Sequence, residues 1–204
     1  MRLRRLVISS AVSALILITG CASLPLEQNI QDGRAALLSG RAEDAMNYFN
    51  HVAELDPNYT TSYALRESVW TYLGRAYYEA GKYTEARSAL EKSLARDKND
   101  NLAHLYLGLA LARSNDRERG LAEMETGLNG IHQWLENISS EDAAGSYWDP
   151  NKQIRRTIEK GLAGQPSAIE VVVIAQRVGK QLEEEIDRVG RDKSRALYNE
   201  GSRN

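Results

Sequence analysis

The sequence predicts an all-α fold in which helical hairpins stack into a solenoid and further helices cap its C-terminal end. Three observations carry this prediction: a composition rich in helix formers, glycines at related positions, and apolar residues spaced three or four apart. Of the 204 residues, 42% are hydrophobic and 26% are charged, which is sufficient for a packed core. Beyond Gly20 the types Ala, Leu, Glu, Arg and Lys dominate, and these side chains lose little rotamer freedom in a helix.

Residues 1–20 have the three parts of an export signal. Arg2, Arg4 and Arg5 form a charged start, and an apolar run follows over residues 6–18. This run is too short to cross a membrane as a helix, which takes about 20 apolar residues. Removing three of the 26 basic residues leaves 23 against 28 acidic ones, so the exported chain would be acidic. We therefore expect no nucleic-acid partner, because that binding relies on basic side chains that neutralise phosphates.

Cys21 ends this segment and is the only cysteine, so it cannot form an internal disulfide. Together with the preceding Thr19 and Gly20 it resembles the lipobox of bacterial lipoproteins. The resemblance implies cleavage before Cys21, acylation of that residue with palmitate and related chains, and stable membrane attachment. A free thiol and an uncleaved signal anchor are the alternatives.

The residue after the cysteine indicates in which membrane the lipoprotein would reside. In lipoproteins of Gram-negative bacteria an Asp at this position is the usual signal for retention in the inner membrane, and this chain has Ala22. The resemblance therefore implies the outer membrane, with the protein facing the periplasm. Residues 21–26 would form a lipidated tether, with the first helix beginning near Glu27. At no more than 3.6 Å per residue, the tether would reach roughly 20 Å.

The pattern Trp70-x-x-Leu73-Gly74-x-x-Tyr77 resembles the first half of the tetratricopeptide repeat. The resemblance implies about three repeats, each a pair of helices, over residues 27–138. The remaining residues that carry it are Gly81, Tyr83, Ala86 and Leu90 in the second repeat, Gly33, Gly40, Ala45, Phe49 and Pro57 in the first, and Leu107, Gly108, Leu111, Gly120 and Met124 in the third.

The spacing of three glycines has a physical reason. Gly33, Gly74 and Gly108 would lie where the two helices of each repeat cross, because a β-carbon there would push the helices apart. The interval from Gly74 to Gly108 equals the length of one repeat, whereas the interval from Gly33 to Gly74 is longer. We expect the extra residues, near 60–66, to lengthen the first helix of the second repeat by about two turns, with Thr60 or Thr61 as its N-cap.

The C-terminal third continues as helices. Apolar residues at steps of three and four predict one long helix that ends near Ile138, followed by a loop over residues 139–149. We expect a helical cap over residues 150–200, because a repeat array needs its exposed end covered. Asp149-Pro150 predicts the start of one capping helix, and Ser167-x-x-Glu170 is a capping box before the next. The charged run at 183–188 is interpreted as a solvated face.

The resemblance also implies a concave groove lined by the first helix of each repeat. Leu102, Leu105 and Leu109 would lie together in one part of this groove and are too apolar to be left exposed to water. We therefore expect the C-terminal helix or a partner segment to cover them. Arg34, Arg75 and Arg113 would either converge on an acidic peptide or a terminal carboxylate, or face solvent. The candidate partner-binding residues are Arg34, Leu38, Thr71, Arg75, Tyr78, Leu102, Leu105, Leu109 and Arg113.

The sequence carries no catalytic or metal-binding motif that we recognise. His51, His104 and His132 occur one per repeat, at spacings that do not match a metal site. Tyr147 and Trp148 would either stack on a ligand or anchor a loop. We expect no cofactor, no metal and no enzymatic activity.

The favoured interpretation is a lipid-anchored scaffold or adaptor that binds a protein or peptide in the bacterial cell envelope. Tetratricopeptide lipoproteins serve secretion, pilus or cell-wall assemblies, so the resemblance implies a role of that kind. The alternative is a purely structural subunit whose groove is filled by its own C-terminal helix. An enzyme is the least favoured of the three.

Overall fold

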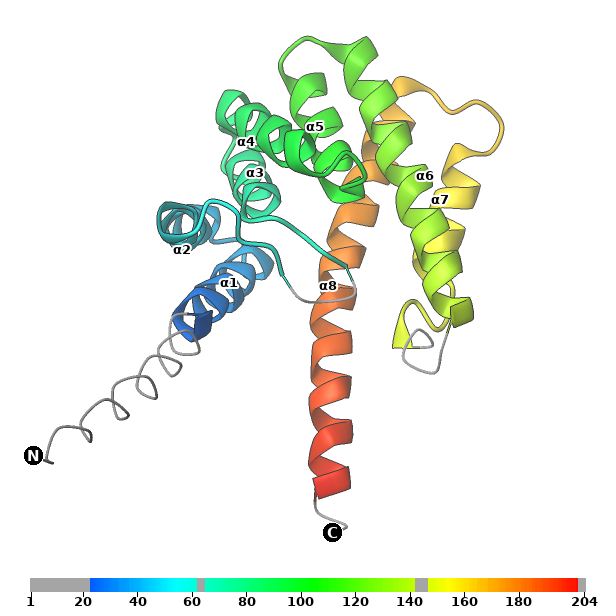
Figure 1. Cartoon of the computed structure of the whole chain (residues 1–204). Helices are drawn as coiled ribbons and strands as arrows, with labels where there is room; N and C mark the ends of the chain where they lie inside the picture. The colour runs from blue at the N-terminus through cyan, green and yellow to red at the C-terminus, as the bar shows by residue number, and fades with distance from the viewer. Residues whose placement is uncertain (1–22, 62–64, 142–146, 202–204) are drawn as a thin grey trace, which may run out of the picture.

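The computed structural model describes residues 23–61, 65–141 and 147–201, and these residues form eight helices. The all-α prediction is confirmed, since the described residues contain one isolated β-bridge and no strand. Figure 1 shows three helical hairpins in succession, with the last helix running beside them. The helices are α1 (Ser23–Leu38), α2 (Ala42–Leu55), α3 (Val69–Glu79), α4 (Tyr83–Arg96), α5 (Asn101–Arg113), α6 (Arg117–Glu141), α7 (Gln153–Leu162) and α8 (Ala168–Gly201).

The three hairpins cross at the predicted glycines. A β-carbon on Gly33 would run into the ring of Phe49, and one on Gly74 would run into Leu90. A β-carbon on Gly108 would meet Met124 and the backbone of the facing helix. In each hairpin the side chain that fills the crossing follows its glycine at the same interval along the sequence. The three hairpins are therefore structurally equivalent repeats, as predicted.

The buried side chains form two adjoining clusters. One lies among α1 to α4 and includes Phe49, whose ring stacks on Tyr72 with centroids 5.1 Å apart. The other extends from α3 and α4 through α5 and α6 to α7 and α8. The C-terminal helices thus share the core of the third repeat, which covers the end of the array.

The connection between α2 and α3 corrects our expectation of a longer helix at residues 60–66. The helix α3 begins only at Val69, with the side chain of Ser68 as its N-cap. Thr60 and Ser68 instead pair in an antiparallel bridge, and the amide of Thr61 donates to the carbonyl of Glu67 at 3.0 Å. Through these hydrogen bonds within the connection, backbone amide and carbonyl groups find partners without forming a helix. Residues 62–64, which suggested helical spacing, lie outside the described part.

Other helix boundaries also differ from those expected. The helix α1 begins at Ser23, before the expected start near Glu27, because Pro25 fits within a first helical turn. The helix α6 continues to Glu141. Residues 1–22, which include Cys21, lie outside the described part.

The helix α7 begins at Gln153, three residues after Pro150. Asp149 still caps it, because its carboxylate accepts hydrogen bonds from the amides of Ile154 at 3.0 Å and Arg155 at 3.1 Å. At the start of α8 the predicted capping box is present: the Ser167 amide donates to Glu170 Oε2 at 2.7 Å. Within the described ranges, every helix is too short or too polar to cross a membrane.

Candidate interaction groove

The groove is formed by the first helices of the repeats, α1, α3 and α5, and α8 lies in it. In Figure 1 the upper part of α8 lies behind α5 and α6. The inner face of α8 is apolar, and its buried residues belong to the same cluster as those of α5. These buried α8 residues are Val171, Ala175, Val178, Leu182, Ile186 and Val189. The chain thus supplies its own helix to the groove.

Glu183 of α8 joins two groove arginines. Its Oε1 accepts a hydrogen bond from Nε of Arg34 at 2.8 Å, and its Oε2 is bonded to Nη2 of Arg75. The side chains of all three residues are at most 5% exposed. Two of the three groove arginines therefore converge, and the carboxylate that they hold belongs to this chain.

The other side of Arg75 contacts a second carboxylate and two aromatic rings. Its Nη1 donates to Glu67 Oε1 at 2.9 Å, and the connection between α2 and α3 places this glutamate in the interior. The guanidinium carbon lies 5.6 Å from the ring centroid of Tyr72 and 5.3 Å from that of Tyr106, within the range of cation–π attraction. We call Arg34, Glu67, Arg75 and Glu183 the buried charge network.

The two glutamates of this network have opposite pKa shifts. Burial raises the pKa of Glu67 from 4.5 to about 7, against the attraction of Arg75. Burial also acts on Glu183, but the charges of Arg75 and Arg34 outweigh it and lower the pKa of that carboxyl. Glu183 is therefore held ionised, as suits a carboxylate clamped between two guanidinium groups.

The three predicted leucines, Leu102, Leu105 and Leu109, are at most 1% exposed. They belong to the cluster shared with α8, so no bare apolar groove exists there. Tyr78 is nearly buried, and its hydroxyl accepts a hydrogen bond from Gln176 of α8 at 2.9 Å.

Two further predicted groove residues lie outside the buried charge network. Thr71 is fully buried, and its hydroxyl bonds with Ser93 at 2.8 Å and with Asp100, so it ties the second repeat to the third. Arg113 is exposed and outside the buried charge network, and a hydrogen bond with the hydroxyl of Tyr78 raises its pKa.

A cavity of about 490 Å³ remains beside α8. Its walls come from α1, α3 and α5 on one side and from α8 on the other. Leu38 at its rim is 41% exposed, which makes it the most accessible of the predicted leucines. The cavity lining contains Leu37, Leu38, Gly40, Arg75, Tyr78, Glu79, Tyr106, Leu109, Gln176, Lys180, Glu183 and Glu184.

The partners of the groove arginines were not predicted from the sequence. Glu183 belonged to a run interpreted as solvated, and that interpretation is wrong for this residue. A signal was present, because Ala175, Gly179 and Glu183 follow one another at steps of four. Small residues at such steps indicate close approach, and a β-carbon on Gly179 would lie 2.7 Å from the hydroxyl of Tyr106.

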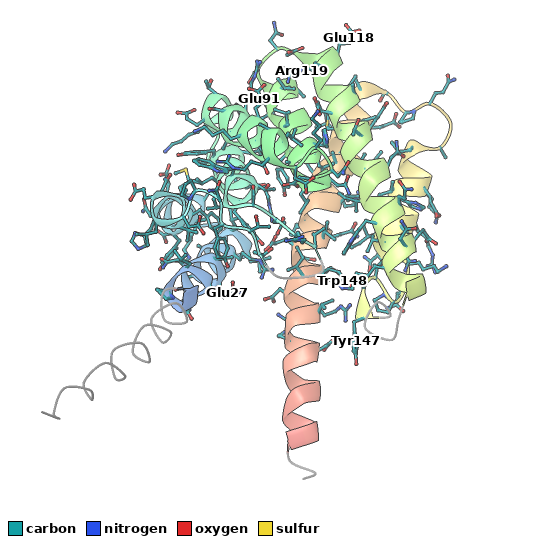
Figure 2. All side chains as sticks on the ribbon, viewed as in Figure 1. Glu27, Glu91, Glu118, Arg119, Tyr147 and Trp148 are labelled. Carbon is teal, nitrogen blue, oxygen red and sulfur yellow. The ribbon has the colours of Figure 1, made fainter. Side chains whose placement is uncertain are left out.

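Trp148, His104 and His132 have structural contacts. Trp148 is buried edge-on against Trp134, with ring centroids 4.9 Å apart, so it anchors the loop. Figure 2 shows Trp148 and the exposed Tyr147 beside α8. His104 bonds Glu123 at 2.6 Å, and His132 bonds Glu159 at 3.0 Å. In the described ranges, no group of three His, Cys, Asp or Glu side chains could hold a metal ion.

Comparison with known proteins agrees with the repeat geometry. Two tetratricopeptide repeat family models match the chain, one over residues 33–59 and the other over residues 73–126. No curated protein matches it. The first match starts at the glycine of the first crossing, and the second match contains the glycines of the other two. The hairpins of this chain are thus tetratricopeptide repeats.

Proposed function

We propose that this chain is a lipid-anchored interaction module of the bacterial cell envelope that binds a protein partner beside its own C-terminal helix. The observation that carries the proposal is Glu183, which is held between Arg34 and Arg75 inside the repeat groove. This contact indicates that the groove accepts a helix and a carboxylate, the features with which a repeat groove recognises peptides. An assembly role in secretion, pilus or cell-wall machinery is the form of this function that we favour.

The partner would bind with α8 in place. Displacing α8 would expose its apolar face and leave two buried arginines without Glu183, which is costly on both counts. The accessible part of the groove is therefore the cavity of about 490 Å³ and its rim. Its mixed lining of leucines, tyrosines and charged side chains suits an amphipathic protein segment.

The envelope part of the proposal rests on the segment up to Cys21. The charged start, the short apolar run and the lone Cys21 fit an export signal followed by a lipid anchor. In the outer membrane, the repeat domain would face the periplasm.

A specific observation also favours a second candidate, a structural subunit without a groove ligand. The helix α8 forms one wall of the groove cavity, and its buried apolar residues share the core of the third repeat. In that case the partner would contact the convex side, which includes α2 and its exposed Leu55.

Site-specific photocrosslinking of the intact membrane-bound protein separates the two candidates. A photoreactive amino acid would replace either Leu38 at the cavity or Leu55 on α2, leucines that are 41% and 60% exposed. The interaction module predicts a discrete crosslinked partner from position 38 and none from position 55. Crosslinks from position 55 alone would support the structural subunit. Absence of a crosslinked protein from either position would refute both.

A further inference from the structure

We propose that the cleft between α7 and α8 is an anion-binding site for a ligand that carries a phosphate group. This cleft lies outside the repeat groove and measures about 540 Å³. Its polar lining includes Arg156 and Lys160 on α7 and Arg177 on α8, together with the amide side chains of Asn151 and Gln153. The proposal does not depend on the function proposed for the groove.

The residue spacing places the cationic groups on facing walls. Gln153, Arg156 and Lys160 follow one another at steps of three and four, so they share one face of α7. Arg177 faces them from α8. The two helices approach closely at Gly161, where a β-carbon would lie 2.6 Å from Ile174 Cδ1. The two helices are therefore in contact at one edge of the cleft, since Gly161 and Ile174 both line it.

The charge of this cleft is not balanced by the protein. In the part of the chain that the structure describes, no carboxylate lines the cleft, and Arg156, Lys160 and Arg177 form no ion pair or side-chain hydrogen bond. Two acidic residues close to these cations in the sequence are engaged elsewhere. Glu159 bonds His132 at 3.0 Å, and Glu170 caps α8 through Ser167.

Several arginines elsewhere in the molecule have carboxylate partners. The whole chain has a net charge of −2, and arginines such as Arg34, Arg75, Arg155 and Arg188 are each held by carboxylates. Three like charges around one cleft repel one another. A bound anion would remove this repulsion.

A phosphate group fits these donors better than a single carboxylate does. Two guanidinium forks can each donate paired hydrogen bonds to phosphate oxygens, and the ammonium group adds a point charge. The cleft is also larger than a bare phosphate ion requires, so it has room for the group that bears the phosphate. A soluble phosphate ester and a phospholipid headgroup share this chemistry.

The test uses the purified full chain in a zwitterionic detergent, with binding measured by calorimetry at low salt. Inorganic pyrophosphate is the soluble probe. Short-chain phosphatidylglycerol and phosphatidylcholine, each mixed into the micelles, test for a headgroup. We expect binding of pyrophosphate or of phosphatidylglycerol, but not of phosphatidylcholine. Binding should weaken as salt is added.

A matched pair of triple variants locates the site. The first carries Arg156→Gln, Lys160→Gln and Arg177→Gln, all at exposed positions, so the fold should persist. The control carries Arg66→Gln, Lys98→Gln and Arg117→Gln, which remove the same charge from exposed positions elsewhere. We expect at least tenfold weaker binding in the first variant and less than a twofold change in the control.

The proposal is overturned if neither probe binds, or if the two triple variants lose affinity equally, since general charge would then explain the binding. Binding of pyrophosphate by the free cleft would identify a soluble phosphate ester as the ligand class. Binding of phosphatidylglycerol alone would identify a lipid headgroup. A melting curve of each variant shows whether its fold has been retained.

Discussion

At each crossing between paired helices, one missing β-carbon determines how closely the helices pack. Gly74 faces the branched end of Leu90, which is fully buried and cannot move aside into solvent. In contrast, a β-carbon at Gly190 on α8 would meet no atom within 4 Å. These two glycines therefore separate the effect of packing from the effect of helix propensity.

Gly74→Ala should lower the free energy of unfolding by about 1–3 kcal/mol, because the added methyl group overpacks the crossing. Gly190→Ala should leave stability unchanged or raise it by up to about 1 kcal/mol, since alanine is the better helix former. Urea unfolding followed by circular dichroism measures both changes. If Gly74→Ala were as harmless as Gly190→Ala, the close crossing would not exist in solution.

The pKa of Glu67 leads to a pH dependence of stability. Because burial raises this pKa from 4.5 to about 7 in the folded state, the folded protein binds the proton more tightly than the unfolded chain. The resulting stability is fully present below pH 4.5 and is lost as the pH rises through about 7. Glu67→Gln removes this contribution.

The free energy of unfolding of the Glu67→Gln variant, relative to the native sequence, should therefore increase between pH 5 and pH 8. The expected increase is about 2 kcal/mol, given that one pKa unit corresponds to roughly 1.4 kcal/mol. Unfolding curves of both proteins at the two pH values give this difference, in which contributions from the histidines cancel. A relative decrease would mean that the ion pair with Arg75 outweighs the cost of burial.

At the scale of the helices, the sequence predicted the elements that depend on local signals. The glycine crossings and the capping box at Ser167 and Glu170 follow from residues at most a few turns apart, and all are present. The connection at residues 60–68 was not predicted, because its bridge between Thr60 and Ser68 depends on backbone pairing that competes with helical periodicity. Local spacing does not reveal which of the two prevails.

The candidate site was harder to predict than the fold. The resemblance implied a groove position for Arg34 and Arg75, but the carboxylate that joins them, Glu183, lies 149 and 108 residues away from them in the chain. Its own neighbours in sequence are mostly charged, which favoured a solvated face. Only the packing of α8 into the groove decides that this carboxylate is buried.

The helix α8 should contribute strongly to stability if it is a fixed part of the groove. Leu182 is fully buried, so Leu182→Ala should cost about 2–5 kcal/mol in the free energy of unfolding. Val173 on the same helix is 48% exposed, and Val173→Ala should change stability by less than about 0.5 kcal/mol. Thermal and urea unfolding provide the comparison. Equal, small effects would indicate that α8 does not remain packed in the groove.

At the scale of the whole molecule, the repeats, the C-terminal helices and the proposed anchor form one arrangement. The helix α1 begins at Ser23, only two residues after Cys21. Two residues extend at most about 7 Å, so an anchor at Cys21 would hold the first repeat next to the lipid. The cavity lies at the other end of α1, since the residues that this helix contributes to its lining are Leu37 and Leu38.

The membrane in which the protein resides can be tested at the residue after the anchor. If the chain is an outer-membrane lipoprotein, Ala22→Asp should shift it to the inner-membrane fraction, because the new carboxylate supplies the retention signal that Ala22 lacks. Ala22→Asn is the matched control of similar size without the charge, and it should remain in the outer-membrane fraction. Separation of the two membranes by density, followed by detection of the protein, measures the distribution. Identical distributions of both variants would contradict sorting through this position. The anchor itself would be contradicted if the mass of the intact protein showed that residues 1–20 are retained and that no acyl group is attached.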